Sequence, residues 1–224
     1  MRVPAEQLAT DYLVLSVELG ERAYGLATLS DRVSLHGVYV APTAAFWGFT
    51  KPADHAVDPG SGRSCWELEH FLRLALTGDP VATECLWSPI ATEHDDIGAG
   101  LRHLRPYLVS RRAYRSHMSH MNTKVDRLRG PVADTDWEAV ADTLRLLISL
   151  GHLLRTGEPL LRVDAYRDRL IDVAAGAYDW DEVRAWRDRL SIAAQDALTA
   201  SKLPDLPDYE LADRFLVETR RRMV

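Results

Sequence analysis

The chain has 224 residues, of which 46% are hydrophobic and 27% are charged, a composition typical of globular proteins that bury a full core. The formal net charge of −6 excludes a general affinity for duplex nucleic acid, which needs a basic excess, although a local basic groove stays open. No apolar leader segment starts the chain and no later run has the roughly 20 apolar residues of a membrane span, so we expect a cytoplasmic protein with no membrane contact.

The chain begins with alternating strand and turn signals. The apolar run Tyr12 to Val17 predicts a buried strand, followed by a turn at Gly20 and a short helix that starts near Arg22. A second strand begins at Val33, and its alternation predicts two faces: Val33, Leu35 and Tyr39 on one, and Arg32, Ser34 and His36 on the other. The polar face of this strand is the first candidate site.

A loop rich in Pro and Gly is predicted from Pro42 to Ser64, with its aromatic residues Phe46, Trp47 and Phe49 packing onto the core. The segment from Cys65 to Gly78 then indicates a strand end that leads into an amphipathic helix with a Gly stop. A short helix from Val81 to Trp87 follows. Cys65 and Cys85 both lie in apolar surroundings, which is typical of buried free thiols.

The rest of the chain reads as helical. Six helical stretches are expected: two around Pro106 within Leu101–Arg127, then Asp136–Arg155, Ala165–Ala174, Trp180–Ala200 and a last helix to Arg222. The shift from strands to helices predicts an α+β protein with two domains, a mixed β-sheet with helices over residues 1–105 and a helical domain over residues 106–224.

Several ordered stretches carry a family resemblance. Gly20, Ala23, Tyr24 and Gly25, followed by the segment Gly37–Val40, resemble the RlaP-like branch of the DNA polymerase beta-type nucleotidyltransferases, whose pattern is G-S-x-A-Y-G-x5-S-D-x-D-x-R-G-V. The likeness continues through VAPTAAFWGF, WELEHFLRLALTGDPVATECLWSP and, more loosely, the later helices. The resemblance therefore covers nearly the whole chain and implies a nucleotidyltransferase-like fold.

The resemblance also implies a chemistry that this chain departs from. In the family, two aspartates on one strand face hold two Mg²⁺ ions, and a Gly-Ser turn receives the phosphates of a nucleoside triphosphate. The alignment puts Arg32 and Ser34 at the two aspartate positions and Glu21 at the serine, whereas Arg145 is kept. We therefore expect a degenerate pocket without catalytic residues, metal or cofactor, for which the candidates are Gly20, Glu21, Arg22, Arg32, Ser34, His36 and Arg145.

Alternatives stay open for several residues. Arg32 could hold an anion in place of the metal, or it could pair with Glu21 and close the old cleft, which we favour. Glu67 and Glu84 are weak metal candidates whose simpler interpretation is a helix-surface or capping carboxylate. The stripe of Asp142, Arg145, Ser149 and His152 could equally face the cleft or the solvent. His117 and His120 lie one helical turn apart but lack a third metal ligand, so we expect them on a solvated or interfacial face.

These observations predict a non-catalytic binding or regulatory subunit. Its partner would be a related, competent nucleotidyltransferase or a second copy of the chain, with a nucleotide as a candidate ligand. The alternative is an active enzyme with a rearranged metal site, which would need Mg²⁺ and would move a nucleotide from a nucleoside triphosphate to a small molecule, a protein or RNA.

Overall fold

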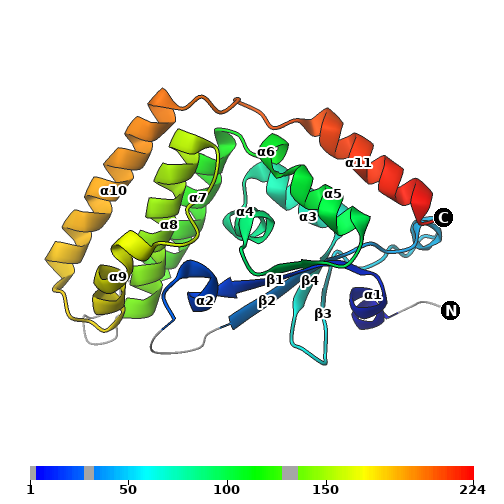
Figure 1. The fold of residues 1–224 in the computed structure, drawn as a ribbon, viewed down its shortest axis with the longest axis horizontal. Helices are drawn as coiled ribbons and strands as arrows, with labels where there is room; N and C mark the ends of the chain where they lie inside the picture. The colour runs from blue at the N-terminus through cyan, green and yellow to red at the C-terminus, as the bar shows by residue number, and fades with distance from the viewer. Residues whose placement is uncertain (1–3, 28–32, 128–135) are drawn as a thin grey trace.

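The computed structural model describes residues 4–27, 33–127 and 136–224, with the side chains of all but residues 123–127. A mixed sheet and its covering helices form one half of the molecule, and a group of helices forms the other (Figure 1). The predicted α+β fold class is confirmed.

The sheet has five strands in the order β3-β4-β2-β1-β5. Their bounds are β1 Leu13–Gly20, β2 Val33–Tyr39, β3 His55–Val57, β4 Ser64–Glu67 and β5 Ala91–Glu93. Strand β1 pairs antiparallel with β2 and β5, β2 pairs parallel with β4, and β3 pairs antiparallel with β4. The two long central strands agree with the predicted ones, whereas the short strands β3 and β5 carry too few residues to show a pattern.

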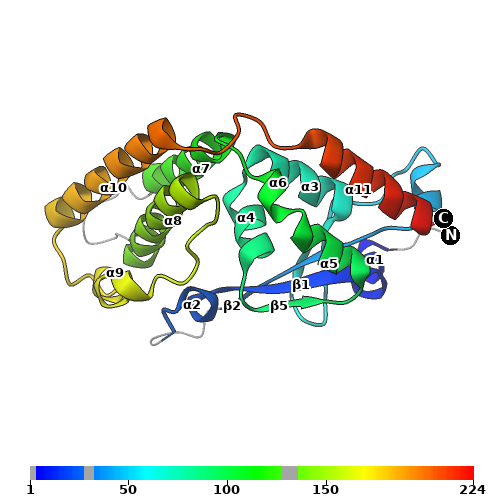
Figure 2. The same cartoon turned by 45° about the horizontal axis from the view of Figure 1, so that its top comes forward.

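Helices cover the sheet unequally. The small helix α1 packs with Tyr39 and Cys65 on one face of the sheet. The larger core lies on the other face, where most of the remaining helices of this half pack (Figure 2). Those helices are α3 Leu68–Thr77, α4 Pro80–Trp87, α5 Asp96–His103, α6 Arg105–Leu108 and α11 Tyr209–Arg222; α1 spans Ala5–Asp11, α2 Glu21–Tyr24 and the 3-10 turn η1 Thr43–Phe46.

Helix α3 shows why the sequence folds as predicted here. The Glu67 side chain caps its N-terminus by accepting a hydrogen bond of 2.8 Å from the Glu69 N–H. Phe71 and Leu72 lie in the core with Leu68 on the buried face. Gly78 ends the helix with φ 74°, a left-handed conformation that a side chain would strain.

The helical half is built around α8. Its helices and turn are α7 Arg112–Arg127, α8 Trp137–Thr156, the 3-10 turn η3 Asp164–Tyr166, α9 Arg167–Ala174 and α10 Trp180–Ala200. One side of α8 packs on α9 and α10 through Leu144 and Ile148. Leu147 and Leu150 instead pack in a second cluster with Met121 of α7. Helix α8 is therefore buried on most sides, which places its few polar residues where they need partners.

The last helix returns to the sheet half. Ala212 lies in the core that covers the sheet, and the Thr43 N–H donates a 3.0 Å hydrogen bond to the Met223 carbonyl. Figures 1 and 2 show α11 beside α5, far along the chain from it. The domain division at residue 105 stays a prediction, and the sheet half receives this late segment as well.

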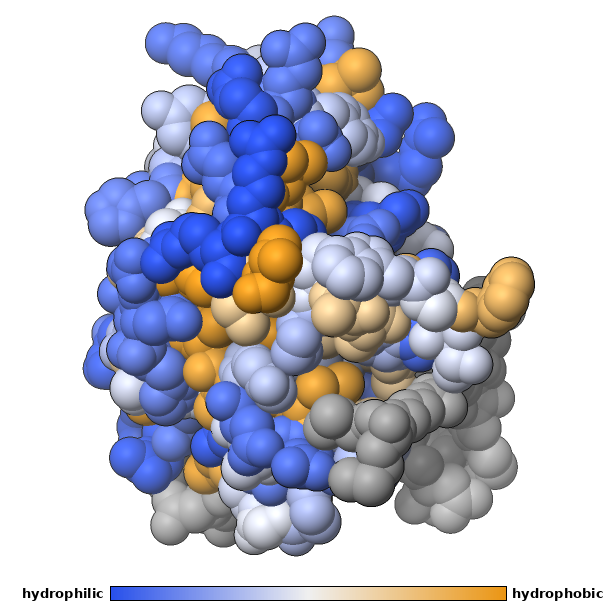
Figure 3. Space-filling model, turned by 90° about the vertical axis from the view of Figure 1, so that its right-hand side faces the viewer, coloured by the Kyte–Doolittle hydropathy of each residue, from blue (hydrophilic) through white to orange (hydrophobic). Residues whose placement is uncertain are grey.

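Two aromatic side chains differ from the expectation. Trp47 is 72% exposed and Phe49 is fully exposed, so the prediction that they pack on the core is wrong for both; Phe46 of the same segment does pack. Along β2, burial increases from Val33, which is 40% exposed at the start of the strand, to the buried Tyr39 at its end. On the face shown in Figure 3, apolar residues lie scattered among hydrophilic ones.

Both cysteines lie in the buried core of the described residues. Cys65 and Cys85 are both buried and free, as predicted, and burial raises the pKa of both thiols.

Within residues 4–27, 33–127 and 136–224, no helix combines the length and the apolar character needed to cross a bilayer.

Candidate functional site

A cleft of about 230 Å³ lies where the two halves of the molecule meet. The turn after β1 and the polar face of β2 form one wall, and helices α4 and α8 form the other. The polar residues and the turn glycine that line it include Gly20, Ser34, His36, Glu84, Asp142 and Arg145. Residues of both predicted domains thus come together at the position that the family resemblance implies.

A buried ion pair crosses this cleft. The Arg145 Nη1 atom lies 2.5 Å from Glu84 Oε1, and the two side chains are only 3% and 5% exposed. Arg145 comes from α8 and Glu84 from α4, so the pair joins the helical half to the sheet half. A charge buried to this degree needs a partner, and each of these two residues supplies it for the other.

Two further residues complete the network around the guanidinium. Asp142 Oδ1 accepts hydrogen bonds from Arg145 Nε at 2.9 Å and from Nη2 at 2.7 Å. The Tyr24 hydroxyl donates a 2.7 Å hydrogen bond to Glu84 Oε2, and the Tyr24 ring lies 3.7 Å from the guanidinium carbon of Arg145. Both cleft carboxylates and the aromatic ring are therefore bound to one arginine.

The network fixes the charge states of its members. Burial lowers the pKa of Arg145, but the carboxylates of Glu84 and Asp142 outweigh burial and hold that pKa well above its ordinary value. Burial, and then the Glu84 carboxylate, raise the pKa of Tyr24 far above its ordinary value. Tyr24 is thus a neutral hydrogen-bond donor, and Arg145 is a permanent cation in this site.

The polar face of β2 forms the other wall. The Ser34 hydroxyl and His36 Nε2 are 2.8 Å apart, and the His36 ring stacks on Trp66 with centroids 5.2 Å apart and an interplanar angle of 5°. Burial lowers the pKa of His36, so the imidazole is neutral at pH 7. These two residues share the strand face as predicted, and they hold each other within the cleft.

The remaining pocket candidates lie at or beyond the cleft edge. Gly20 begins α2 with φ 107°, a conformation open to glycine, and Glu21 is half-buried behind it. Arg22 is 54% exposed and pairs with Glu18 at 3.3 Å, so it points away from the cleft. Arg32 lies outside the described residues, and the predicted pairing of Arg32 with Glu21 therefore stays a prediction.

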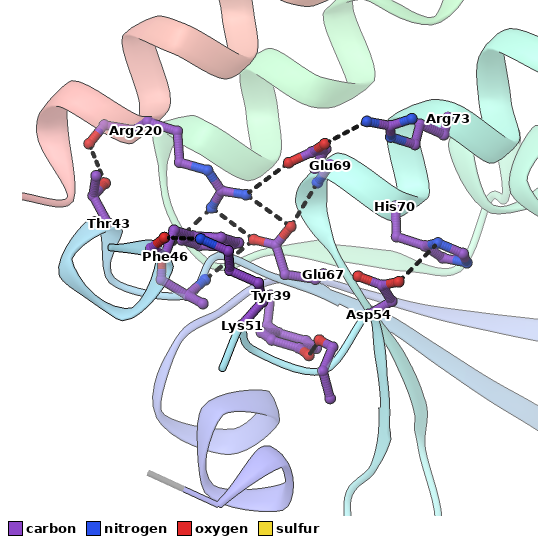
Figure 4. A network of polar contacts seen from close by, with 12 residues as sticks. Tyr39, Thr43, Phe46, Lys51, Asp54, Glu67, Glu69, His70, Arg73 and Arg220 are labelled. Carbon is purple, nitrogen blue, oxygen red and sulfur yellow. Dashed lines mark hydrogen bonds and ion pairs between the residues drawn. The ribbon is translucent and has the colours of Figure 1, made fainter. Parts of the chain in front are cut away.

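Glu67 has a structural role and does not line the cleft. Arg220 of α11 binds it bidentately, with Nη1–Oε1 2.7 Å and Nη2–Oε2 2.9 Å, and the same carboxylate caps α3 (Figure 4). The Arg220 guanidinium also lies 4.0 Å from the Phe46 ring, and Thr43 donates to the Arg220 carbonyl. Figure 4 shows Glu67 surrounded by this network. The interpretation of Glu67 as a capping carboxylate is confirmed, and both of its oxygens already accept hydrogen bonds.

The polar stripe of α8 and the histidines of α7 divide between core and surface. Arg145 and Ser149 are both buried, so the stripe is not a solvated face there. His117 is buried too, with Nδ1 2.9 Å from the Ala113 carbonyl, and burial lowers its pKa to about 4. The prediction of a solvated or interfacial face at His117 is wrong, because α7 packs that side against α4 and α8.

Glu84 is buried, so its interpretation from the sequence as a helix-surface carboxylate is wrong. The available signal was the composition of α4, in which Glu84 stands among Ala82, Cys85 and Leu86, all of them buried. Arg145 likewise stands between apolar residues of α8, and a charge in such a position indicates that it has a partner. Tyr24 carried no such signal.

The described cleft does not fit a pair of metal ions. Its two carboxylates, Glu84 and Asp142, both accept hydrogen bonds from Arg145. Among the residues that the structure describes, no group of three or more His, Cys, Asp and Glu side chains could hold a metal ion. The guanidinium also occupies the position beside both carboxylates and would repel a cation there.

The mixed sheet, the turn at Gly20 after β1 and the cleft between β2 and α8 agree with the nucleotidyltransferase-like fold that the family resemblance implies. Comparison with known families specifies it further. Residues 4–218 match RlaP, described as the RNA repair pathway DNA polymerase beta family, and the chain belongs to that family. No curated protein and no solved structure gave a match.

Proposed function

We propose that this chain is a non-catalytic member of its family that serves as a binding or regulatory subunit. The observation that carries the proposal is the presence of Arg32 and Ser34 at the two positions that the family pattern gives to aspartates. The cleft supports it, because its carboxylates Glu84 and Asp142 are both bound to Arg145, with Arg145 Nη1 2.5 Å from Glu84 Oε1. Without two metal ions, the activation barrier for nucleotide transfer would rise by several kcal/mol, which lowers the rate by on the order of 1000-fold or more.

The size and charge of the cleft support the same conclusion. Its volume of about 230 Å³ is below the roughly 300–1,000 Å³ that small-molecule sites take. Among its described lining residues, the carboxylates of Glu84 and Asp142 outnumber the single cation Arg145. A triphosphate would meet net negative charge there without a metal to screen it. A partner protein, either a competent nucleotidyltransferase or a second copy of the chain, is therefore the more suitable ligand.

A transfer assay tests the proposal. The purified protein is incubated with each labelled nucleoside triphosphate, with Mg²⁺ or Mn²⁺, and with protein, RNA and small-molecule acceptors. We expect no label on any acceptor or on the chain itself. Metal-dependent transfer that is lost in Glu84→Gln, while Glu69→Gln keeps it, would overturn the proposal, because Glu69 is a carboxylate outside the cleft.

One observation favours a second candidate function. Glu84 and Asp142 come from two different helices and line one cleft. If Arg145 moved aside, the two carboxylates could serve as a rearranged ligand set for Mg²⁺ and a nucleoside triphosphate. The active-enzyme alternative therefore predicts that Glu84→Gln and Asp142→Asn each abolish transfer, and the same assay separates the two candidates.

A further inference from the structure

Helix α10 turns one face outward along its whole length. Asp179 caps its N-terminus by accepting hydrogen bonds from two N–H groups of the first turn. Val183 and Trp186 pack in one buried cluster, and Ala194 and Ala197 pack in the next. In Figures 1 and 2, α10 forms the left-hand side of the molecule. The side of the helix opposite the two clusters therefore faces the solvent.

The outward face carries a large apolar residue near its middle. Ile192 is 63% exposed, although isoleucine is among the residue types most often buried. Ala185, Ala193 and Ala200 are exposed on the same face. Side chains as small as alanine let the axes of two helices approach to about 8 Å. A single exposed isoleucine is ordinary, so these apolar residues alone do not identify a partner.

Two opposite charges share this face. Arg189 and Asp196 are both exposed, and neither makes a hydrogen bond or an ion pair within the described part of the chain. They stand seven residues apart, so they lie on one side of the helix, about 10 Å apart along its axis. In contrast, Arg187 and Asp188 already bind each other at 2.7 Å. The exposed apolar residues and the two free charges form the α10 stripe: Ala185, Arg189, Ile192, Ala193, Asp196 and Ala200.

The α10 stripe is complementary to itself in the antiparallel direction. A second α10 can run antiparallel to the first about a two-fold axis that passes between Ile192 and Ala193. Arg189 of each copy then faces Asp196 of the other, Ile192 faces Ala193, and the alanines at the two ends of the stripe face each other. A parallel pair in the same register would instead place like charges side by side. The stripe therefore has the arrangement that a two-fold interface requires, in which both copies use the same surface.

We propose that the chain forms a two-fold dimer through the α10 stripe, with an Arg189–Asp196 ion pair on each side of an apolar centre. A second copy is the favoured partner because binding of an unrelated protein does not require a self-complementary order of charges. The interface uses one helix from each copy, so the dimer is reversible and forms with rising concentration. No residue of α10 is among the described residues that line the cleft. The dimer goes beyond the proposed function and does not depend on whether the cleft is catalytic.

Sedimentation velocity over about 2 to 200 μM protein tests this interface. Arg189→Asp and Asp196→Arg each place like charges opposite each other, whereas an equimolar mixture of the two variants restores opposite charges at both positions. Arg184→Asp is the matched control, since Arg184 is a 51% exposed arginine of the same helix, about 140° around it from Arg189. Circular dichroism confirms that each variant is folded.

We expect the wild-type chain and the control variant to dimerise with the same affinity. The dissociation constant of the dimer should rise by at least about 100-fold in each single charge reversal and return to within about threefold of the wild-type value in the mixture. A wild-type chain that stays monomeric, a dimer that survives both reversals, an equal effect of the control variant, or a mixture that stays monomeric would each overturn the proposal. None of these outcomes changes the transfer assay, so failure of the interface is distinguishable from failure of the proposed function.

Discussion

Replacing Arg145 by methionine tests the buried pair that closes the cleft. The substitution keeps most of the side-chain volume but leaves Glu84, which is 5% exposed, without its cation. Removal of one member of a buried ion pair costs about 3–5 kcal/mol, because the remaining charge stays desolvated. With a urea m-value of about 3 kcal/mol/M, this loss lowers the unfolding midpoint by about 1 to 2 M.

The assay is urea unfolding followed by tryptophan fluorescence, with Arg184→Met as the control. Arg184 pairs with Asp181 on the surface of α10, where its side chain is 51% exposed, and its loss should leave the midpoint unchanged. The double variant Glu84→Leu/Arg145→Met should be more stable than the sum of the two single effects, since it leaves no charge at the buried Glu84 position and the remaining carboxylate, Asp142, is 32% exposed. Equal midpoints for Arg145→Met and Arg184→Met would refute the reasoning.

Three further outcomes are expected. Arg220→Met should destabilise the fold by about 3 kcal/mol, because Glu67 is 2% exposed and loses the cation that binds it. Arg221→Met should leave the stability unchanged, and the urea midpoints of the two variants test this difference. Burial lowers the pKa of His117 to about 4 in the fold, whereas in the unfolded chain this pKa is about 6.5. As the pH falls from 6.5 to 4, only the unfolded chain binds a proton at this residue, so the free energy of unfolding should fall by up to about 3 kcal/mol. His117→Gln should remove this part of the pH dependence. Gly98→Ala puts a Cβ 2.1 Å from a carbonyl oxygen of β1 and should abolish soluble expression unless α5 shifts.

Much of the fold could be predicted from local patterns. The strand at β1, the helix α3 with its stop at Gly78 and the long helices α8 and α10 follow from apolar periodicity and end signals that lie within each segment. The return of α11 to the sheet could not be predicted, because it depends on the contact of Arg220 with Glu67, which are 153 residues apart. Trp47 shows the converse error, since an aromatic side chain alone does not decide burial.

The candidate site was predictable only in part. Gly20, Ser34 and His36 follow from the alternation of β2 and the turn before it, and all three line the cleft. The pair of Glu84 with Arg145 joins two helices 61 residues apart, and no spacing within either helix encodes it. A charge inside an apolar helix indicates that a partner exists, but the tertiary fold selects which one.

Calorimetric titration with ATP and with GTP, each with and without Mg²⁺, tests the central claim that the cleft holds no metal-bound nucleotide. The account predicts no Mg²⁺-dependent heat of binding for the wild-type chain and none for Glu84→Gln. Tight binding that requires Mg²⁺ and disappears in Glu84→Gln would contradict it, because Glu84 would then hold a metal ion rather than Arg145.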